Sequence, residues 1–154
     1  MGCVESNMIR AESLIENVRK WAERRDDIRA LVLVGSHARG EARPDSDVDL
    51  VLICADPSHY LDTTDWLSTF GAVMRFARED WGKVQSVRVF YQDGSEVEFG
   101  ITGTDWAAVP VDSGTAAVLR NGASVLLDRD GQVDAALRSV GGSASERETP
   151  VNER

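Results

Sequence analysis

In the segment "PDSDVDLVLI", residues 44–53, three aspartates are spaced two residues apart. Residues two apart in a β-strand point to the same face, so Asp45, Asp47 and Asp49 would crowd negative charge on one surface. Such a surface needs a counter-charge, and a divalent cation with oxygen ligands is the natural candidate. We therefore predict a metal site with Asp47 and Asp49 as ligands. Asp45 follows Pro44 and is expected to be a turn or capping residue.

A glycine–serine turn precedes the aspartates, in the segment "VGSHARG". Gly35 lets the backbone approach a ligand closely, and a helical turn that follows it offers free N–H groups to phosphate oxygens. We expect Ser36 to cap this turn, which would extend through Ala42. Arg39 lies one turn further on and could add a charge-assisted contact to a triphosphate. The alternative for Arg39 is an ion pair with a surface acid such as Glu41.

A third carboxylate is expected from a β-hairpin further along the chain. Two strands flank an Asp-Gly turn, and on the second strand apolar residues alternate with Glu96 and Glu98. If this strand lies beside the aspartate strand, Glu98 can join Asp47 and Asp49 on one surface. Three carboxylates favour Mg²⁺, which commonly binds carboxylates together with substrate phosphates. Glu98 is the predicted third ligand, and Glu96 is the alternative.

The spacing of apolar residues predicts the elements that position these groups. Their order indicates an α+β fold, a mixed sheet with helices mainly on one face. Trp66, Trp81 and Trp106 are expected in the core. The expected elements are a helix over 8–25, strands over 28–35 and 48–55, a helix over 64–77, a hairpin over 84–102, short helices over 104–110 and 113–122, a strand over 123–128 and a helix over 130–140.

Composition narrows the class of protein. The chain has 154 residues, of which 42% are hydrophobic, and this favours one domain over 1–140. Residues 141–154 are mostly polar and are expected to form a disordered tail. No apolar run approaches the length of a membrane span, so we expect a cytoplasmic protein. The net charge of −9 argues against a nucleic-acid partner and weakly favours cationic ones.

Gly35-Ser36, followed after a short spacer by Asp47-Val48-Asp49, resembles the signature of the DNA polymerase β-type nucleotidyltransferase superfamily. The resemblance covers residues 28–101. It is strongest to the bacterial antibiotic nucleotidyltransferases, especially aminoglycoside adenylyltransferases, and to the minimal nucleotidyltransferases of toxin–antitoxin pairs. It implies the polymerase β-like fold, with the two motif aspartates and a third carboxylate holding Mg²⁺. Glu98 stands where that third acid is expected, in place of the more usual Asp.

The resemblance implies Mg²⁺-dependent transfer of AMP from ATP to a hydroxyl of a small molecule such as an aminoglycoside. Two alternatives are an antitoxin-type enzyme that adenylylates a partner protein and a non-catalytic nucleotide-binding module. Many members carry a helical domain after the catalytic core, whereas only residues 102–140 follow the hairpin before the polar tail. We therefore expect the acceptor pocket to be shallow, or completed by a second subunit in a homodimer or by another protein. No membrane partner is expected.

Overall fold

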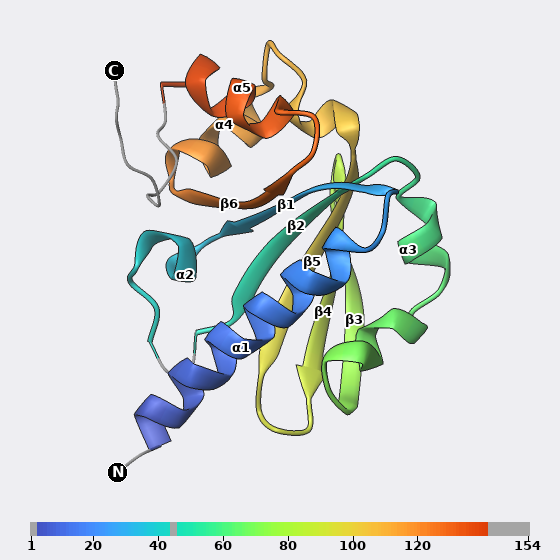
Figure 1. Ribbon diagram of the computed structural model, residues 1–154, viewed down its shortest axis with the longest axis vertical. Helices are drawn as coiled ribbons and strands as arrows, with labels where there is room; N and C mark the ends of the chain where they lie inside the picture. The colour runs from blue at the N-terminus through green and yellow to red at the C-terminus, as the bar shows by residue number, and fades with distance from the viewer. Residues whose placement is uncertain (1–2, 44–45, 142–154) are drawn as a thin grey trace.

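Six strands form one sheet in the computed structural model, which describes residues 3–43 and 46–141 of the chain. The strands are β1 (Ile28–Val34), β2 (Val48–Cys54), β3 (Val73–Trp81), β4 (Val84–Tyr91), β5 (Glu96–Gly103) and β6 (Ala123–Asp128). Their order across the sheet is β3-β4-β5-β2-β1-β6 (Figure 1). β2 and β5 run parallel, while the other neighbours are antiparallel. The predicted α+β fold with a mixed sheet is confirmed.

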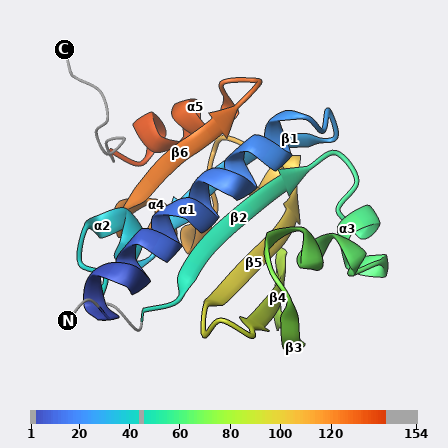
Figure 2. The same cartoon turned by 60° about the horizontal axis from the view of Figure 1, so that its bottom comes forward.

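Helices cover both faces of this sheet, whereas they were expected mainly on one face. They are α1 (Cys3–Glu23), α2 (Ser36–Arg39), α3 (Ser58–Asp62), α4 (Ser113–Arg120) and α5 (Gln132–Ser139), with 3₁₀ turns η1 (Asp65–Phe70) and η2 (Thr104–Ala107). The longest, α1, crosses one face, and α4 and α5 lie against the other beside β6 (Figures 1 and 2). Both faces are covered because α4, α5 and η2 pack on the face opposite to α1. Within the described part of the chain, no helix is long and apolar enough to cross a membrane.

An aromatic cluster seals the face under α1. The ring of Trp21 stacks on that of Trp66 with centroids 5.3 Å apart, and Phe99 meets Trp66 edge-on at 5.0 Å. Such pairs add to the stabilisation that comes from burying their surface. Trp66 and, on the opposite face, Trp106 are both buried, as predicted. The side chain of Trp81 is not among those that the structure describes.

The alternation of side chains along β2 decides where the aspartates lie. Leu50 and Leu52 pack under α1, whereas Val51 and Ile53 belong to the second core, beneath α4 and α5. Because successive residues of a strand face opposite sides, Asp49 shares the face of Val51. The carboxylates therefore lie on the face of the sheet opposite to α1.

The predicted helix over 64–77 is wrong. Only η1 is helical there, and the chain then enters β3, which pairs with β4 along its length. A tight turn joins the two strands: Gly82 has a φ of 77°, and its N–H donates to Asp80 Oδ1 at 2.9 Å. Cross-strand pairing through this turn overrides the helical spacing of the apolar residues.

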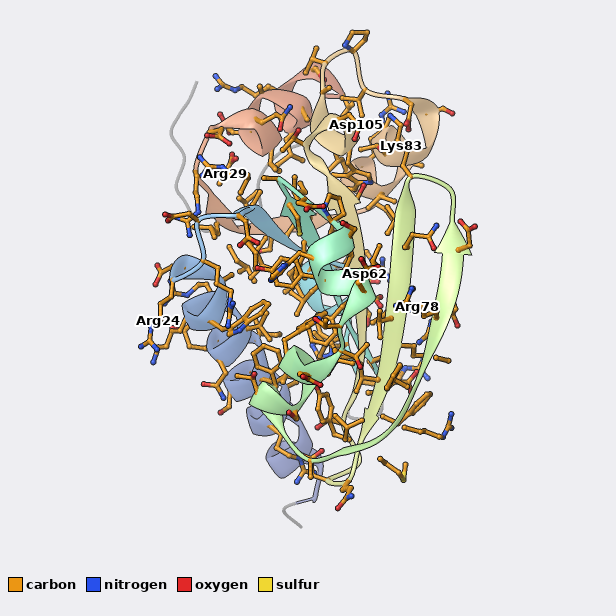
Figure 3. All side chains as sticks on the ribbon, turned by 90° about the vertical axis from the view of Figure 1, so that its right-hand side faces the viewer. Arg24, Arg29, Asp62, Arg78, Lys83 and Asp105 are labelled. Carbon is orange, nitrogen blue, oxygen red and sulfur yellow. The ribbon has the colours of Figure 1, made fainter. Side chains whose placement is uncertain are left out.

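β3 forms one edge of the sheet. Two of the residues that suggested a helix are exposed on it, with Met74 at 59% and Phe76 at 44% exposure. Figure 3 looks onto this edge, where Arg78 lies on β3 and Lys83 follows the turn into β4. The apolar periodicity of this segment therefore did not mark a buried helix face.

Arg129, just after β6, ties the sheet to the end of α1. Its guanidinium donates to four backbone carbonyls, those of Ile28 at 2.8 Å, Ala22 at 3.0 Å, Glu23 at 2.8 Å and Arg25 at 3.2 Å. The last carbonyls of a helix have no partner within it and favour a nearby cation. Arg129 thus closes the C-terminal end of α1.

Candidate active site

The turn between β1 and α2 packs directly against β2. Gly35 has a φ of 79°, and a Cβ atom built on it would lie 2.4 Å from Asp49 Oδ2. Both the backbone conformation and the contact therefore require glycine. The two parts of the sequence motif, the glycine–serine turn and the aspartate pair, are in contact.

The helical turn after Gly35 is shorter than predicted, and its cap is different. Gly35 is the N-cap residue, and the cap makes no side-chain hydrogen bond, so the predicted capping role of Ser36 is wrong. α2 ends at Arg39 because Gly40 takes the left-handed conformation, with a φ of 74°. The predicted extension through Ala42 is therefore also wrong.

Three carboxylates meet on the face of β2 and β5 that is opposite to α1. Asp49 and Glu98 are direct neighbours in the parallel pairing, and Asp47 precedes β2. One oxygen of each of the three lies within 4.8 Å of the others, which confirms the predicted adjacency. In the part of the chain that is described, Glu96 does not belong to this group. Asp45, like Pro44, lies outside the described residues.

The surroundings of Asp49 suit a hard cation. Burial, together with the neighbouring charges of Asp47 and Glu98, raises the pKa of Asp49 to about 8. Its Oδ1 atom is buried and has no hydrogen-bond partner. A buried acceptor without a partner is costly, and a bound cation would both satisfy this oxygen and favour the charged carboxylate. The donor set, all carboxylate oxygens, fits Mg²⁺.

Arg88 on β4 lies among these acids and joins them to two more. Its guanidinium donates to Asp47 at 3.0 Å, Glu98 at 2.8 Å, Glu96 at 2.8 Å and Glu79 at 3.3 Å. Burial disfavours its charged form, but its four carboxylate partners together outweigh burial and raise the pKa of Arg88. Arg88 is therefore a permanent positive charge among four carboxylates.

An apolar cleft of about 340 Å³ adjoins the carboxylates. Asp49 and Glu98 form its acidic wall. A Cβ atom on Gly100 of β5 would lie 2.9 Å from Val84 Cγ1 of β4. The glycine therefore leaves room for the side chain of Val84 at the wall of the cleft. The remaining lining residues are Val34, Leu50, Val51, Val84, Ser86, Gly100, Trp106 and Val118.

Arg39 is the last residue of α2, and its side chain pairs with an acid. Its Nε atom is 3.0 Å from Glu41 Oε1. A Cβ atom on Gly122 would lie 2.7 Å from Arg39 Cγ, so the stem of Arg39 packs on that glycine. The ion pair is the alternative that the sequence offered, and a contact between Arg39 and a nucleotide stays a prediction.

Comparison with known proteins places this arrangement in a family. The model of the streptomycin adenylyltransferase family matches residues 8–152. The chain belongs to this family. Among solved structures, it is similar to an aminoglycoside 6-adenyltransferase from Bacillus subtilis, with a TM-score of 0.52 and 15% sequence identity. The match covers 63% of this chain and 36% of that one, and it shows a shared nucleotidyltransferase fold. A search of curated proteins found no match.

For this member of the streptomycin adenylyltransferase family, reasoning from the sequence missed Arg88 and Glu79. A signal for Arg88 was present in the hairpin: the β4–β5 register places Arg88 directly opposite Glu98. Opposite charges facing each other across two antiparallel strands stabilise the pair. Glu79 could not be found in the same way, because the expected helix over 64–77 covers the first part of β3 and no strand is expected at Glu79.

Proposed function

We propose that this protein transfers AMP from ATP to a hydroxyl of an aminoglycoside-like acceptor and releases pyrophosphate, with Mg²⁺ at the carboxylate site. The observation that carries the proposal is the gathering of Asp47, Asp49 and Glu98 beside the Gly35 turn. Membership of the streptomycin adenylyltransferase family supports the same reaction.

In this mechanism the acceptor oxygen attacks the α-phosphorus of ATP. The bond from that phosphorus to its bridging oxygen breaks, and pyrophosphate leaves. Asp47, Asp49 and Glu98 would hold Mg²⁺, which when bound would neutralise the phosphate charge. Glu98 accepts the proton of the acceptor hydroxyl. The backbone that follows Gly35 positions the phosphates, and Arg39 leaves Glu41 to pair with the triphosphate.

The cleft beside the carboxylates is suited to hold the nucleobase or the acceptor. Its apolar lining suits the flat face of a nucleobase or a ring, and its acidic wall suits an amino or hydroxyl group. The net charge of −9 favours the approach of a polycation such as an aminoglycoside. Whether a second subunit completes the acceptor pocket stays a prediction.

The test compares two glutamates of the same strand, Glu98 and Glu96. Glu98 and Glu96 lie on the same face of β5 and both bind Arg88, but Glu98 alone of the two belongs to the carboxylate group. We expect Glu98→Gln to lower the rate of pyrophosphate release about 10²-fold or more, because it removes a ligand and proton acceptor. Glu96→Gln should change it by less than about fivefold.

The rates are measured with ATP, Mg²⁺ and a panel of aminoglycosides, and the adduct is identified by mass spectrometry. An increase in acceptor mass by one AMP that disappears in Asp49→Asn supports the proposal. Equal losses in the two glutamate variants would remove the role of Glu98. Binding of ATP without transfer to any acceptor would leave the non-catalytic module as the function.

A further inference from the structure

Arg88 has two kinds of partner. Toward β5 and β2 it binds Glu98 and Asp47, which belong to the candidate cation site. It also binds Glu79 on β3 and Glu96 at the start of β5, which do not belong to that group. A guanidinium on Asp47 and Glu98 competes with a divalent cation for the same negative charge.

Two buried oxygens at this cluster have no hydrogen-bond partner, and they lie on opposite sides of Arg88 in the strand order. One is Asp49 Oδ1 on β2, and the other is Glu79 Oε1 on β3. A buried acceptor without a partner is costly, so each oxygen favours a new donor or cation. A cation bound by the three carboxylates would satisfy the first. A guanidinium shifted fully onto Glu79 would satisfy the second.

From these observations we infer that Arg88 is an exchangeable counter-ion for the cation site. Without a divalent cation it neutralises Asp47 and Glu98. When the cation binds, Arg88 gives up these two acids and forms a two-pronged pair with Glu79, keeping Glu96 as a second partner. Arg88 thereby sets the affinity of the site for the cation, and Glu79 is the residue that receives it. This inference rests on the cation site of the proposed function.

The two residues should act in opposite directions on cation affinity. Arg88→Gln frees the ligands and removes a repelling charge, so Mn²⁺, a spectroscopic probe for Mg²⁺, should bind about tenfold more tightly. Glu79→Gln removes the receiving carboxylate and holds Arg88 on Asp47 and Glu98, so Mn²⁺ should bind several-fold more weakly. Arg88→Lys keeps the positive charge but loses the planar, two-pronged donor geometry of the guanidinium. Its affinity for Mn²⁺ should lie between those of the wild type and Arg88→Gln.

The experiment measures the dissociation constant of Mn²⁺ by electron paramagnetic resonance on the wild type, Arg88→Gln, Glu79→Gln and the double variant. Loss of a negative charge weakens cation binding by itself, so the double variant is decisive. If Glu79 acts through Arg88, Glu79→Gln weakens Mn²⁺ binding less in the Arg88→Gln background than in the wild type. Asp80→Asn and Arg78→Gln, changes at neighbouring positions on β3, are the matched controls and should leave the affinity unchanged.

Each result has one meaning. Unchanged or weaker binding in Arg88→Gln overturns the exchange and makes Arg88 a residue that orients the ligands. An equal effect of Glu79→Gln with and without Arg88 removes the receiving role of Glu79. If neither the wild type nor Arg88→Gln binds Mn²⁺, or if Asp49→Asn binds it as well as the wild type, the cation site of the proposed function fails instead.

Discussion

Arg88 and Arg129 each join four oxygen acceptors with one guanidinium, but the acceptors differ in charge. Those of Arg129 are backbone carbonyls at the end of α1 and the start of β1. Those of Arg88 are carboxylates from three segments of the sheet. Carbonyls are neutral and must have a donor when buried, whereas carboxylates can exchange one cation for another. The same side chain therefore fixes the fold in one region and leaves the other adjustable.

The largest effect on stability is expected at Arg129. Arg129→Met should lower the free energy of unfolding by about 3 kcal/mol, because it removes four hydrogen bonds from a charged donor, although the carbonyls of Ala22 and Arg25 keep a backbone donor. The loss should be the same with and without Mg²⁺, as measured by urea unfolding. Arg138 is the control, since among the described residues its guanidinium pairs with Asp134 alone, on the exposed side of α5. Arg138→Met should cost less than about 0.5 kcal/mol, and equal losses in the two variants would end the comparison.

A smaller effect should appear as a pH dependence at the carboxylates. Asp49 has a pKa of about 8 in the folded protein, raised by burial and by the charges of Asp47 and Glu98, which Arg88 binds. Between its unfolded pKa of 3.8 and about 8, the folded state holds a proton that the unfolded state has released. Its contribution to stability is therefore complete below the unfolded pKa and is lost as the pH rises through the folded one.

Asp49→Asn tests the predicted direction of this pH dependence. In the presence of EDTA, the free energy of unfolding of the wild type should fall by about 2 kcal/mol relative to the variant between pH 5 and about pH 6.5, because the slope is about 1.4 kcal/mol per pH unit between the two pKa values. Denaturant titrations at unit steps of pH measure the difference. Parallel pH profiles for the two proteins would mean that neither burial nor the neighbouring carboxylates raise the pKa of Asp49 in the folded state.

The smallest effect should be the loss of Arg88 itself. Arg88→Met should destabilise the cation-free protein by about 1 kcal/mol, since the side chain is partly exposed and its acids can be hydrated or protonated. Added Mg²⁺ should restore most of this loss and none of the loss in Arg129→Met. Thermal unfolding with Mg²⁺ and with EDTA measures both. If Mg²⁺ does not change the loss of stability in Arg88→Met, then Arg88, like Arg129, only stabilises the fold.

Most of the sheet was predictable because its strands carry strong local signals. β1 and β2 are apolar runs, and the Asp-Gly turn marks the β4–β5 hairpin. β3 was not predicted, because its apolar residues also fit a helical period and two of them are exposed on the strand. The Gly82 turn was the better signal, since it joins β3 to a strand that was recognised.

The candidate site was predictable to the extent that it depends on alternation within strands. The positions of Asp47, Asp49 and Glu98 follow from strand faces, once β2 and β5 are neighbours. That adjacency depends on the packing of the whole sheet and could only be hypothesised. Arg88 needed the register of the hairpin, and Glu79 needed β3. Contacts that span several strands are set by tertiary structure and leave no local pattern.

The parallel pairing of β2 with β5 has a consequence for the order of folding. β1 and β2 are joined by residues 35–47, and β3, β4 and β5 by two tight turns, so the strands of each group pair with their neighbours in the sequence. The pairing of β2 with β5 must wait for residues 55–95 to close a long loop. Glu79, Glu96 and Glu98 therefore meet Arg88 first, within one group, and the two aspartates arrive from the other. We expect the acids to be already partly neutralised when the two halves of the sheet dock.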